Sequence, residues 1–257
     1  MTTPHTPKKS LGQNFLHDAS YIGRIVQAID PRPGDRVVEI GPGQGALTLP
    51  LLRRHGALTV IEFDRDLVGP LADMAAGVGE LEIIHRDVLQ VDFTALAAGT
   101  PFKLAGNLPY NISSPILFHA LEHAAVVRDM VFMLQKEVVD RMGAPPGSKV
   151  YGRLSVMLQA YCQVQPLFVV PPGAFRPAPK VDSAVVRLVP RDPASVAIAD
   201  RRRFEHVVRA AFGQRRKTLR NALREVCTQQ QFDAAGVSAD ARAEQVDVAG
   251  FIRLANA

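Results

Sequence analysis

The sequence predicts an α/β fold in which a parallel sheet is wound with helices and is followed by a small helical region. Three observations support this prediction. Strand-like apolar runs alternate with helical stretches of about 10 to 15 residues through the first half of the chain. Polar or glycine-rich turns directly follow these strands. Beyond a linker marked by Pro190 and Pro193, the pattern becomes helical.

The first domain, residues 1–190, contains the expected sheet. Its parallel strands are expected over residues 36–40, 58–61, 81–84, 102–106 and 130–134. Two later β-rich segments, 162–170 and 183–189, flank a proline-rich loop and are expected to complete the sheet as a hairpin-like pair. Open α/β sheets bind ligands beyond the carboxyl ends of their parallel strands, so the residues at those ends are the candidates for a site.

The second domain, residues 191–257, is expected to be small and helical. Helices are expected roughly over 200–212 and 218–228, and shorter segments follow to the end of the chain. The linker between the domains lies near 190–199.

The composition indicates a globular protein of a reducing compartment. Of its 257 residues 47% are hydrophobic and 21% are charged, which is enough for a core. Cys162 and Cys227 lie far apart and belong to no CxxC pair, which argues against a disulfide framework or a cysteine zinc site. The polar residues 1–13 do not resemble a signal peptide, and no segment approaches the roughly 20 apolar residues that span a bilayer. We therefore expect a cytoplasmic protein with no membrane partner.

Two histidines have the spacing of metal ligands on a helix. His119 and His123 are four residues apart, and such a pair can bind one metal ion. No third ligand is evident nearby, so we interpret them as histidines on a helix face and predict no metal.

The net charge of +5 arises entirely from the last third of the chain, residues 185–257. Its densest part, 201–224, holds a single acid, Glu205. A solvated helical face is the simpler reading, but this asymmetry of sign favours a polyanion partner, and we expect nucleic acid. The candidate contacts are Arg201, Arg202, Arg203, Arg215, Arg216, Lys217 and Arg220.

A glycine-rich turn follows the first strand, where backbone can approach a ligand closely. The glycines of Gly41-x-Gly43-x-Gly45 fit a methyltransferase pattern, and they also fit a permissive dinucleotide fingerprint. Glu62, at the end of the second strand, suits a ribose diol in either case. Asp87, at the end of the third strand, is placed to meet an adenine amine. Together with the amine pocket at the end of the fourth strand, which a hydride-transfer enzyme does not need, it favours S-adenosylmethionine over NAD. Each acid taken singly is equally consistent with a helix N-cap or a solvated strand end.

The tetrapeptide Asn107-Leu108-Pro109-Tyr110 ends the fourth strand and suits a flat group with an exocyclic amine. The amide oxygen of Asn107 and the carbonyl of Leu108 can accept both hydrogens of an NH2 group, and Pro109 stiffens the turn. Tyr110 can stack on the attached ring. An ordinary turn is the alternative, since asparagine and proline are common turn residues. The pocket fits an amino base lifted out of its stack.

Four segments, in this order, resemble the KsgA (RsmA) family of rRNA adenine dimethyltransferases, which are relatives of the Erm enzymes. They are Lys8-Lys9-Ser10-Leu11-Gly12-Gln13-Asn14-Phe15-Leu16, Glu39-Ile40-Gly41-Pro42-Gly43-Gln44-Gly45, Asn107-Leu108-Pro109-Tyr110 and Phe175-Arg176-Pro177-Ala178-Pro179-Lys180-Val181-Asp182-Ser183. The resemblance covers essentially the whole chain.

That resemblance implies a Rossmann-like, seven-stranded S-adenosylmethionine-dependent methyltransferase domain with a small all-helical C-terminal domain. It implies dimethylation of the N6 atoms of two adjacent adenines in the 3′-terminal hairpin loop of 16S rRNA, within an immature small subunit. A segment over 8–18 would cover the cofactor, Phe175 would close the second face of the target ring, and the protein would act as a monomer. The cofactor contacts implied are Gln13, Asn14, Leu16, Gly41, Gly43, Glu62, Asp87 and Asn107.

Three alternatives stay open on the sequence alone. A methyltransferase acting on DNA adenine or on protein glutamine could use the same amine pocket, but it would not account for the first and last segments of the resemblance. A NAD-dependent oxidoreductase fits the glycine turn alone. A ribosome-assembly factor that acts mainly by binding is the alternative of another class.

Overall fold

The computed structural model describes residues 7–8, 12–214 and 216–257. The chain forms two compact units. The first comprises Met1–Val139 and Gln165–Pro190, and the second comprises Asp140–Val164 and Arg191–Ala257. Within the described residues, no helix has both the length and the apolar character needed to cross a membrane.

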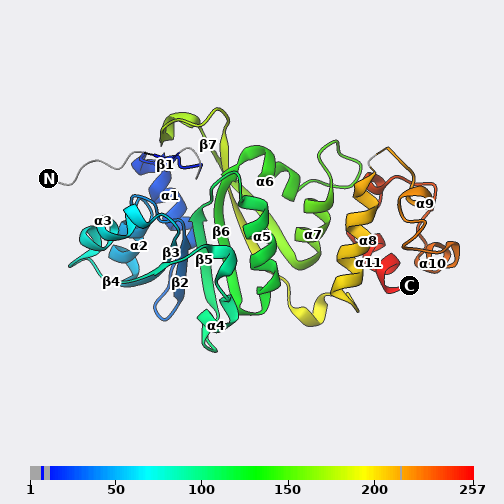
Figure 1. The fold of residues 1–257 in the computed structure, drawn as a ribbon, viewed down its shortest axis with the longest axis horizontal. Coiled ribbons are helices and arrows are strands. Elements are labelled where there is room, and N and C mark those ends of the chain that lie inside the picture. The colour runs from blue at the N-terminus through cyan, green and yellow to red at the C-terminus, as the bar shows by residue number, and fades with distance from the viewer. Residues whose placement is uncertain (1–6, 9–11, 215) are drawn as a thin grey trace. The chain divides into compact units, whose positions relative to one another are not determined.

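A seven-stranded sheet forms the centre of the first unit, with the strand order β4-β3-β2-β5-β6-β9-β7. Its strands except β9 are labelled in Figure 1. The strands are β2 (Arg36–Ile40), β3 (Ala57–Glu62), β4 (Glu80–His85), β5 (Phe102–Asn107), β6 (Val127–Gln135), β7 (Cys162–Val170) and β9 (Ser183–Pro190). The first five pair in parallel, and β9 is antiparallel to β6. The predicted α/β sheet is therefore confirmed, including the neighbouring position of its last two segments.

Helices cover both faces of this sheet. They are α1 (Ala19–Ile29), α2 (Thr48–His55), α3 (Arg65–Ala75), α4 (Phe93–Ala97) and α5 (Ser113–Glu122). Another helix, α6 (Lys136–Met142), follows β6 directly. Side chains alternate between faces along a strand, so Phe102 and Ala105 of β5 point to opposite sides. Ala105 belongs to the buried cluster that α1, α2 and α3 share with the sheet. On the other face, Phe102 contacts Phe93 of α4 edge to face, with ring centres 5.9 Å apart.

A short second sheet ties the amino-terminal segment to a distant part of the same unit. Strand β1 (Phe15–Leu16) pairs antiparallel with β8 (Phe175–Arg176). The backbone N–H of His17 extends the contact by donating to the carbonyl of Ala174 at 2.9 Å. Leu16 and Phe175, which face each other in register, are 5% and 2% exposed and join the main apolar cluster.

The second unit is a helical cluster. Its helices are α7 (Arg153–Tyr161), α8 (Arg201–Gly213), α9 (Leu219–Ala222), α10 (Gln229–Ala235) and α11 (Val248–Asn256). Phe204 and Val207 of α8 and Phe251 and Leu254 of α11 are fully buried. The helix expected over 200–212 agrees with α8.

The helix expected over 218–228 is wrong in extent, because only α9 is helical there. The backbone of this segment bonds elsewhere: the N–H of Leu219 donates to Ala241 at 2.8 Å, and the N–H of Arg220 donates to Ala239 at 2.7 Å. Thr218 also forms a β-bridge with Arg242. These N–H groups belong to the first turn of α9, where a helix leaves them without an internal partner, so the long-range bonds fix where α9 begins. Beyond Ala222 the N–H of Val226 bonds to the carbonyl of Leu223, three residues back, at 2.8 Å, which is a turn rather than an α-helical bond.

Candidate functional site

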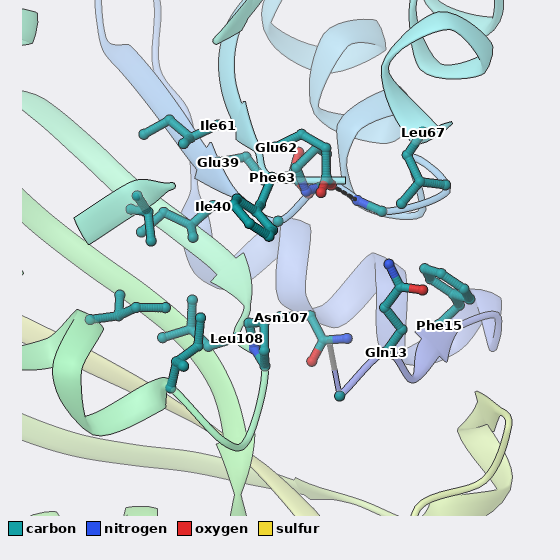
Figure 2. A pocket seen from close by; sticks show the side chains of 18 of the residues that line it. Gln13, Phe15, Glu39, Ile40, Ile61, Glu62, Phe63, Leu67, Asn107 and Leu108 are labelled. Carbon is teal, nitrogen blue, oxygen red and sulfur yellow. Dashed lines mark hydrogen bonds between the residues drawn. The ribbon is translucent and has the colours of Figure 1, made fainter. Parts of the chain in front are cut away.

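A cavity of about 270 Å³ lies at the carboxyl ends of β2, β3, β4 and β5. Figure 2 shows Glu62 and Asn107 on strand ends and Gln13 and Phe15 on the amino-terminal segment. The structure brings together nearly all of the predicted cofactor and amine-pocket residues here. Those that line the cavity are Gln13, Asn14, Leu16, Gly41, Gly43, Glu62, Asp87, Asn107, Leu108, Pro109 and Tyr110.

The glycine turn after β2 forms one wall of the cavity. Gly41 and Gly43 have φ angles of 65° and 56°, a left-handed conformation that favours glycine. A Cβ atom on Gly43 would lie 3.1 Å from the ring of Phe15. The N–H of Gly41 donates to the carbonyl of Ile61 at 2.9 Å, which fixes the turn to the end of β3. Bare backbone is therefore presented to whatever occupies the cavity.

Glu62 is a buried carboxylate held by two backbone donors. The N–H of Asp64 donates to its Oε1 at 2.7 Å, and the N–H of Gly43 donates to its Oε2 at 3.2 Å. Burial raises the pKa of Glu62, although these backbone bonds oppose the rise. Each carboxylate oxygen has a further lone pair, so Glu62 can still accept hydroxyl hydrogens from a ligand.

Asp87 has a structural role and also faces the cavity. One oxygen of its side chain accepts from the N–H of Leu89 at 3.0 Å and caps a short helical turn, Val88–Gln90. This is the N-cap that the sequence left open as an alternative. Because Asp87 also lines the cavity, its second oxygen remains for an amine.

Asn107 at the end of β5 has a defined amide orientation. Its Nδ2 donates to the main-chain carbonyl of Asn14 at 3.0 Å. This bond uses one of the two Nδ2 hydrogens and fixes the orientation of the amide, and no hydrogen bond from a described residue engages the Oδ1 acceptor. The backbone N–H of Leu108 donates to Met133 at 3.0 Å, and no hydrogen bond from a described residue engages its carbonyl oxygen. Two acceptors thus remain at the strand end.

Tyr110 is anchored from a distant strand. Its hydroxyl and the Ser183 hydroxyl at the start of β9 are 2.6 Å apart. Burial raises the pKa of this phenol, so it stays neutral. The fixed hydroxyl leaves the ring as a platform at the edge of the cavity.

The structure does not bring Phe175 to the cavity. Its side chain is only 2% exposed and packs in the apolar cluster with Leu16, its partner in the short β1–β8 sheet. Contact with a bound ring would require this side chain to leave the core.

Among the cavity residues that were not assigned a role from the sequence, Glu39 and Phe63 have side chains that suit one. Glu39 in β2 is 1% exposed, and its Oε2 accepts from the hydroxyl of Thr48 at 2.7 Å. Burial raises the pKa of Glu39 to about 8. Phe63 lines the cavity beside Glu62 and is 60% exposed, although it is a large apolar residue. Two features of the sequence could have indicated these residues. Glu39 is a charged residue inside an apolar strand, and Phe63 is an aromatic residue directly after an acid at a strand end.

The basic residues of the second unit fall into two groups. Arg201 bonds Glu205 at 2.9 Å, Arg203 donates to the carbonyl of Val226 at 2.7 Å, and Arg220 bonds Asp240 at 3.2 Å. These three stabilise the unit itself. The side chains of a second group are exposed, and no ion pair with a described residue engages them. This group is Arg202, Arg216 and Lys217. Arg215 lies outside the described residues.

The two histidines take part in packing. His119 bonds the carbonyl of Val91 at 2.8 Å, His123 bonds the hydroxyl of Thr94 at 2.9 Å, and both rings contact Phe93. The described part of the chain contains no cluster of three potential metal ligands.

Comparison with known proteins identifies close relatives. The family model described as "Ribosomal RNA adenine dimethylase" matches residues 4–257. "Ribosomal RNA small subunit methyltransferase A" of Xanthomonas campestris pv. campestris (strain B100) is 78% identical over 249 residues, covering 97% of this chain and 95% of the relative. The protein of the same name from Xanthomonas axonopodis pv. citri (strain 306) is equally similar over the same shares.

Two solved structures share the fold over nearly the whole chain. A dimethyladenosine transferase from Plasmodium falciparum has a TM-score of 0.78 and 25% identity, covering 93% of this chain and 95% of that one. The 23S rRNA methyltransferase ErmE has a TM-score of 0.72 and 28% identity, covering 95% and 98%.

Proposed function

Because this chain belongs to the ribosomal RNA adenine dimethylase family, we propose that it dimethylates the N6 atoms of two adjacent adenines in the 3′-terminal hairpin loop of small-subunit 16S rRNA. The chain is an rRNA methyltransferase, and its methyl donor is of the S-adenosylmethionine type. S-adenosylmethionine itself, the choice of adenines and the residue roles below are parts of the proposal.

The orientation of Asn107 is the observation that carries this proposal. The bond from its Nδ2 to the Asn14 carbonyl leaves Oδ1 free, and the carbonyl of Leu108 provides a second acceptor beside it. An exocyclic amine of adenine has two hydrogens to donate, so it matches the pair. A pocket built for a carboxylate or a phosphate would instead present donors.

The residues around the cavity fit the proposed donor. Left-handed glycines leave the turn after β2 open to close approach, and Glu62 retains lone pairs for the two hydroxyls of a ribose. Asp87 faces the same cavity for an adenine amine, and the exposed ring of Phe63 beside Glu62 offers a face for the base. Gln13, Asn14 and Leu16 of the amino-terminal segment complete the lining.

Catalysis requires orientation more than acid–base chemistry. When bound, the donor supplies an electrophilic methyl group attached to a sulfonium, and the thioether that remains after transfer is the leaving group. Asn107 and Leu108 accept the hydrogens of the amine, which directs its lone pair toward the methyl group. Tyr110 holds the ring by stacking. The attacking nitrogen becomes acidic as it is alkylated, so its proton can leave to water or through these acceptors.

The second unit supplies the proposed RNA contacts. The exposed group of Arg202, Arg216 and Lys217 is available to phosphates, whereas Arg201, Arg203 and Arg220 are engaged within the unit. We assign methyl transfer to residues 1–190 and RNA binding to residues 191–257. An immature small subunit is the proposed substrate, and we infer a cytoplasmic monomer.

Methyl transfer to unmethylated small subunits tests the proposal directly. Labelled S-adenosylmethionine should label the 16S rRNA, and mapping should place the methyl groups on two adjacent adenines. Naked 16S rRNA and mature subunits serve as parallel substrates, and we expect less transfer to both. Label confined to DNA, to protein or to other nucleotides would contradict the assignment.

A further inference from the structure

A polar network joins the amino-terminal segment to the loop after β3, outside the contacts assigned above. Its centre is Asp64, which is 4% exposed. The carboxylate of Asp64 accepts from Lys8 Nζ at 2.5 Å, from Gln13 Nε2 at 2.8 Å and from the N–H of Asp66 at 3.2 Å. Burial alone would raise the pKa of Asp64, but the bonds from Lys8 and Gln13 outweigh it and hold the pKa below its ordinary value.

The network holds both the oxygen and the nitrogen of the Gln13 side-chain amide. The Oε1 atom of Gln13 accepts from the backbone N–H of Lys8 at 2.7 Å, while its Nε2 atom donates to Asp64. With the amide held in this way, the main chain that follows it is also restricted. The next residue, Asn14, is the one whose carbonyl accepts from Asn107.

The same network reaches the carboxylate assigned to the ribose. The backbone N–H of Asp64 donates to Glu62 Oε1 at 2.7 Å. Asp64 therefore contacts Glu62 through its backbone and the amino-terminal segment through its side chain. Lys8 adds a second bond, from Nζ to Asp66 at 2.7 Å, so its charge faces two acids.

We propose that Lys8 and Asp64 are positioning residues for donor binding, which act by holding Gln13 and Glu62 in one hydrogen-bonded network. The inference rests on the proposed function, since it places the donor in the cavity beyond β3. The network bonds directly to Gln13 and Glu62 on the donor side of the cavity, and it reaches the adenine acceptor Asn107 only through the main chain of Asn14. Its loss should therefore weaken donor binding and leave the affinity for RNA unchanged.

Replacement of Lys8 is the first test, because its side chain is 39% exposed and removing it leaves no buried cavity. Lys8→Met should raise the Kd for S-adenosylhomocysteine and the KM for S-adenosylmethionine about tenfold, as expected for one charge-assisted hydrogen bond. The kcat and the KM for subunits should stay within about twofold. Lys8→Arg should restore most of the affinity, because it keeps the charge.

A remote ion pair provides the matched control. Arg54 and Asp30 are 3.0 Å apart and both 43% exposed, and neither lines the cavity. Arg54→Met removes a comparable contact and should change neither the Kd nor the KM. The melting temperature of each variant without donor shows whether any effect reflects folding.

Asp64→Asn tests the contact from its other side. In a double-mutant cycle with Lys8→Met, the combined loss of affinity should be much smaller than the product of the single losses. Fully multiplicative losses, or a Lys8→Met effect below twofold, would overturn the inference. A fall in kcat or subunit affinity as large as the fall in donor affinity would also overturn it. If the wild-type protein neither bound S-adenosylhomocysteine nor methylated subunits, the proposed function itself would fail, and these outcomes are therefore distinguishable.

Discussion

The amide nitrogen of Asn107 lies 3.0 Å from the carbonyl oxygen of Asn14, a residue 93 positions earlier in the chain. This bond decides which end of the Asn107 amide faces the cavity. An amide that could turn over would present donor and acceptor alternately, and only the acceptor matches an amine. The amino-terminal segment therefore helps to define the chemistry of the pocket as well as covering it.

Replacement of Asn107 should separate methyl transfer from donor binding. Asn107→Ala removes one of the two acceptors proposed for the target amine, so we expect kcat to fall at least about 100-fold. The Kd for S-adenosylhomocysteine, measured by titration calorimetry, should change only a few-fold. Transfer at the wild-type rate would contradict the assignment. If this inactive variant still bound immature subunits and altered their assembly, a binding role beyond catalysis would gain support.

Donor binding should depend on pH through Glu62. Burial raises the pKa of Glu62, and the ionised form is the one that accepts from both ribose hydroxyls. Affinity for S-adenosylhomocysteine should therefore fall as the pH drops through this raised pKa, at a higher pH than for an ordinary glutamate. Glu62→Gln should bind about tenfold more weakly near neutral pH and lose this acid limb. An identical pH profile in both proteins would remove Glu62 from the ribose site.

The stability of the protein should decline with rising pH because of Glu39. The pKa of Glu39 is raised to about 8, so the folded protein keeps a proton that the unfolded chain loses above an ordinary glutamate pKa. The stability that the protonated Glu39 contributes is fully present below the pKa of this residue in the unfolded chain, and it is lost as the pH rises toward about 8. As the pH rises, the free energy of unfolding of the wild type should therefore fall relative to that of Glu39→Gln by up to about 1 kcal/mol per pH unit.

A second glutamate provides the control for Glu39. Glu82 also accepts from a threonine hydroxyl, that of Thr59 at 2.9 Å, but it is exposed. Urea unfolding of Glu82→Gln from pH 5 to 8 should give a curve parallel to that of the wild type. If Glu39→Gln also ran parallel, the buried carboxyl would not be protonated in the folded state.

The two groups of basic residues should respond differently to substitution. Removing the exposed group with Arg202→Ala, Arg216→Ala and Lys217→Ala together should weaken RNA binding and reduce its salt slope by about 2. The melting temperature of this triple variant should stay near that of the wild type. Arg203→Ala instead leaves the Val226 carbonyl without its donor and should lower the melting temperature. Unchanged RNA affinity in the triple variant would exclude this surface.

The cavity could be predicted from the sequence because its chemistry follows strand ends. Glu62 and Asn107 end their strands, Asp87 lies two residues past the end of β4, and parallel strands bring their carboxyl ends to one edge of a sheet. Local pattern and one general rule of topology were therefore sufficient. The cover over the cavity was different, since the roles of Gln13 and Asn14 came only from the family resemblance.

The features that local pattern could not predict depend on long-range pairing. Phe175 lies in a proline-rich loop that suits a binding role, but β8 pairs with β1 and buries it. A basic run does not reveal that Arg203 donates to Val226 or that Arg220 meets Asp240. Glu39 is an exception, because a carboxyl inside an apolar strand is visible in the sequence and deserved a role.

The position of β9 has a consequence for how the protein is made. This strand is the last of the sheet to be synthesised, yet it lies between β6 and β7, and it carries the Ser183 hydroxyl that anchors Tyr110. Likewise, β1 emerges first and must wait for β8 before it is paired. A nascent chain that stops before residue 183 has every strand end that lines the cavity but lacks the Ser183 hydroxyl that anchors Tyr110. In the proposed function, the anchor of the ring that stacks on adenine is thus the last part of the site to be synthesised.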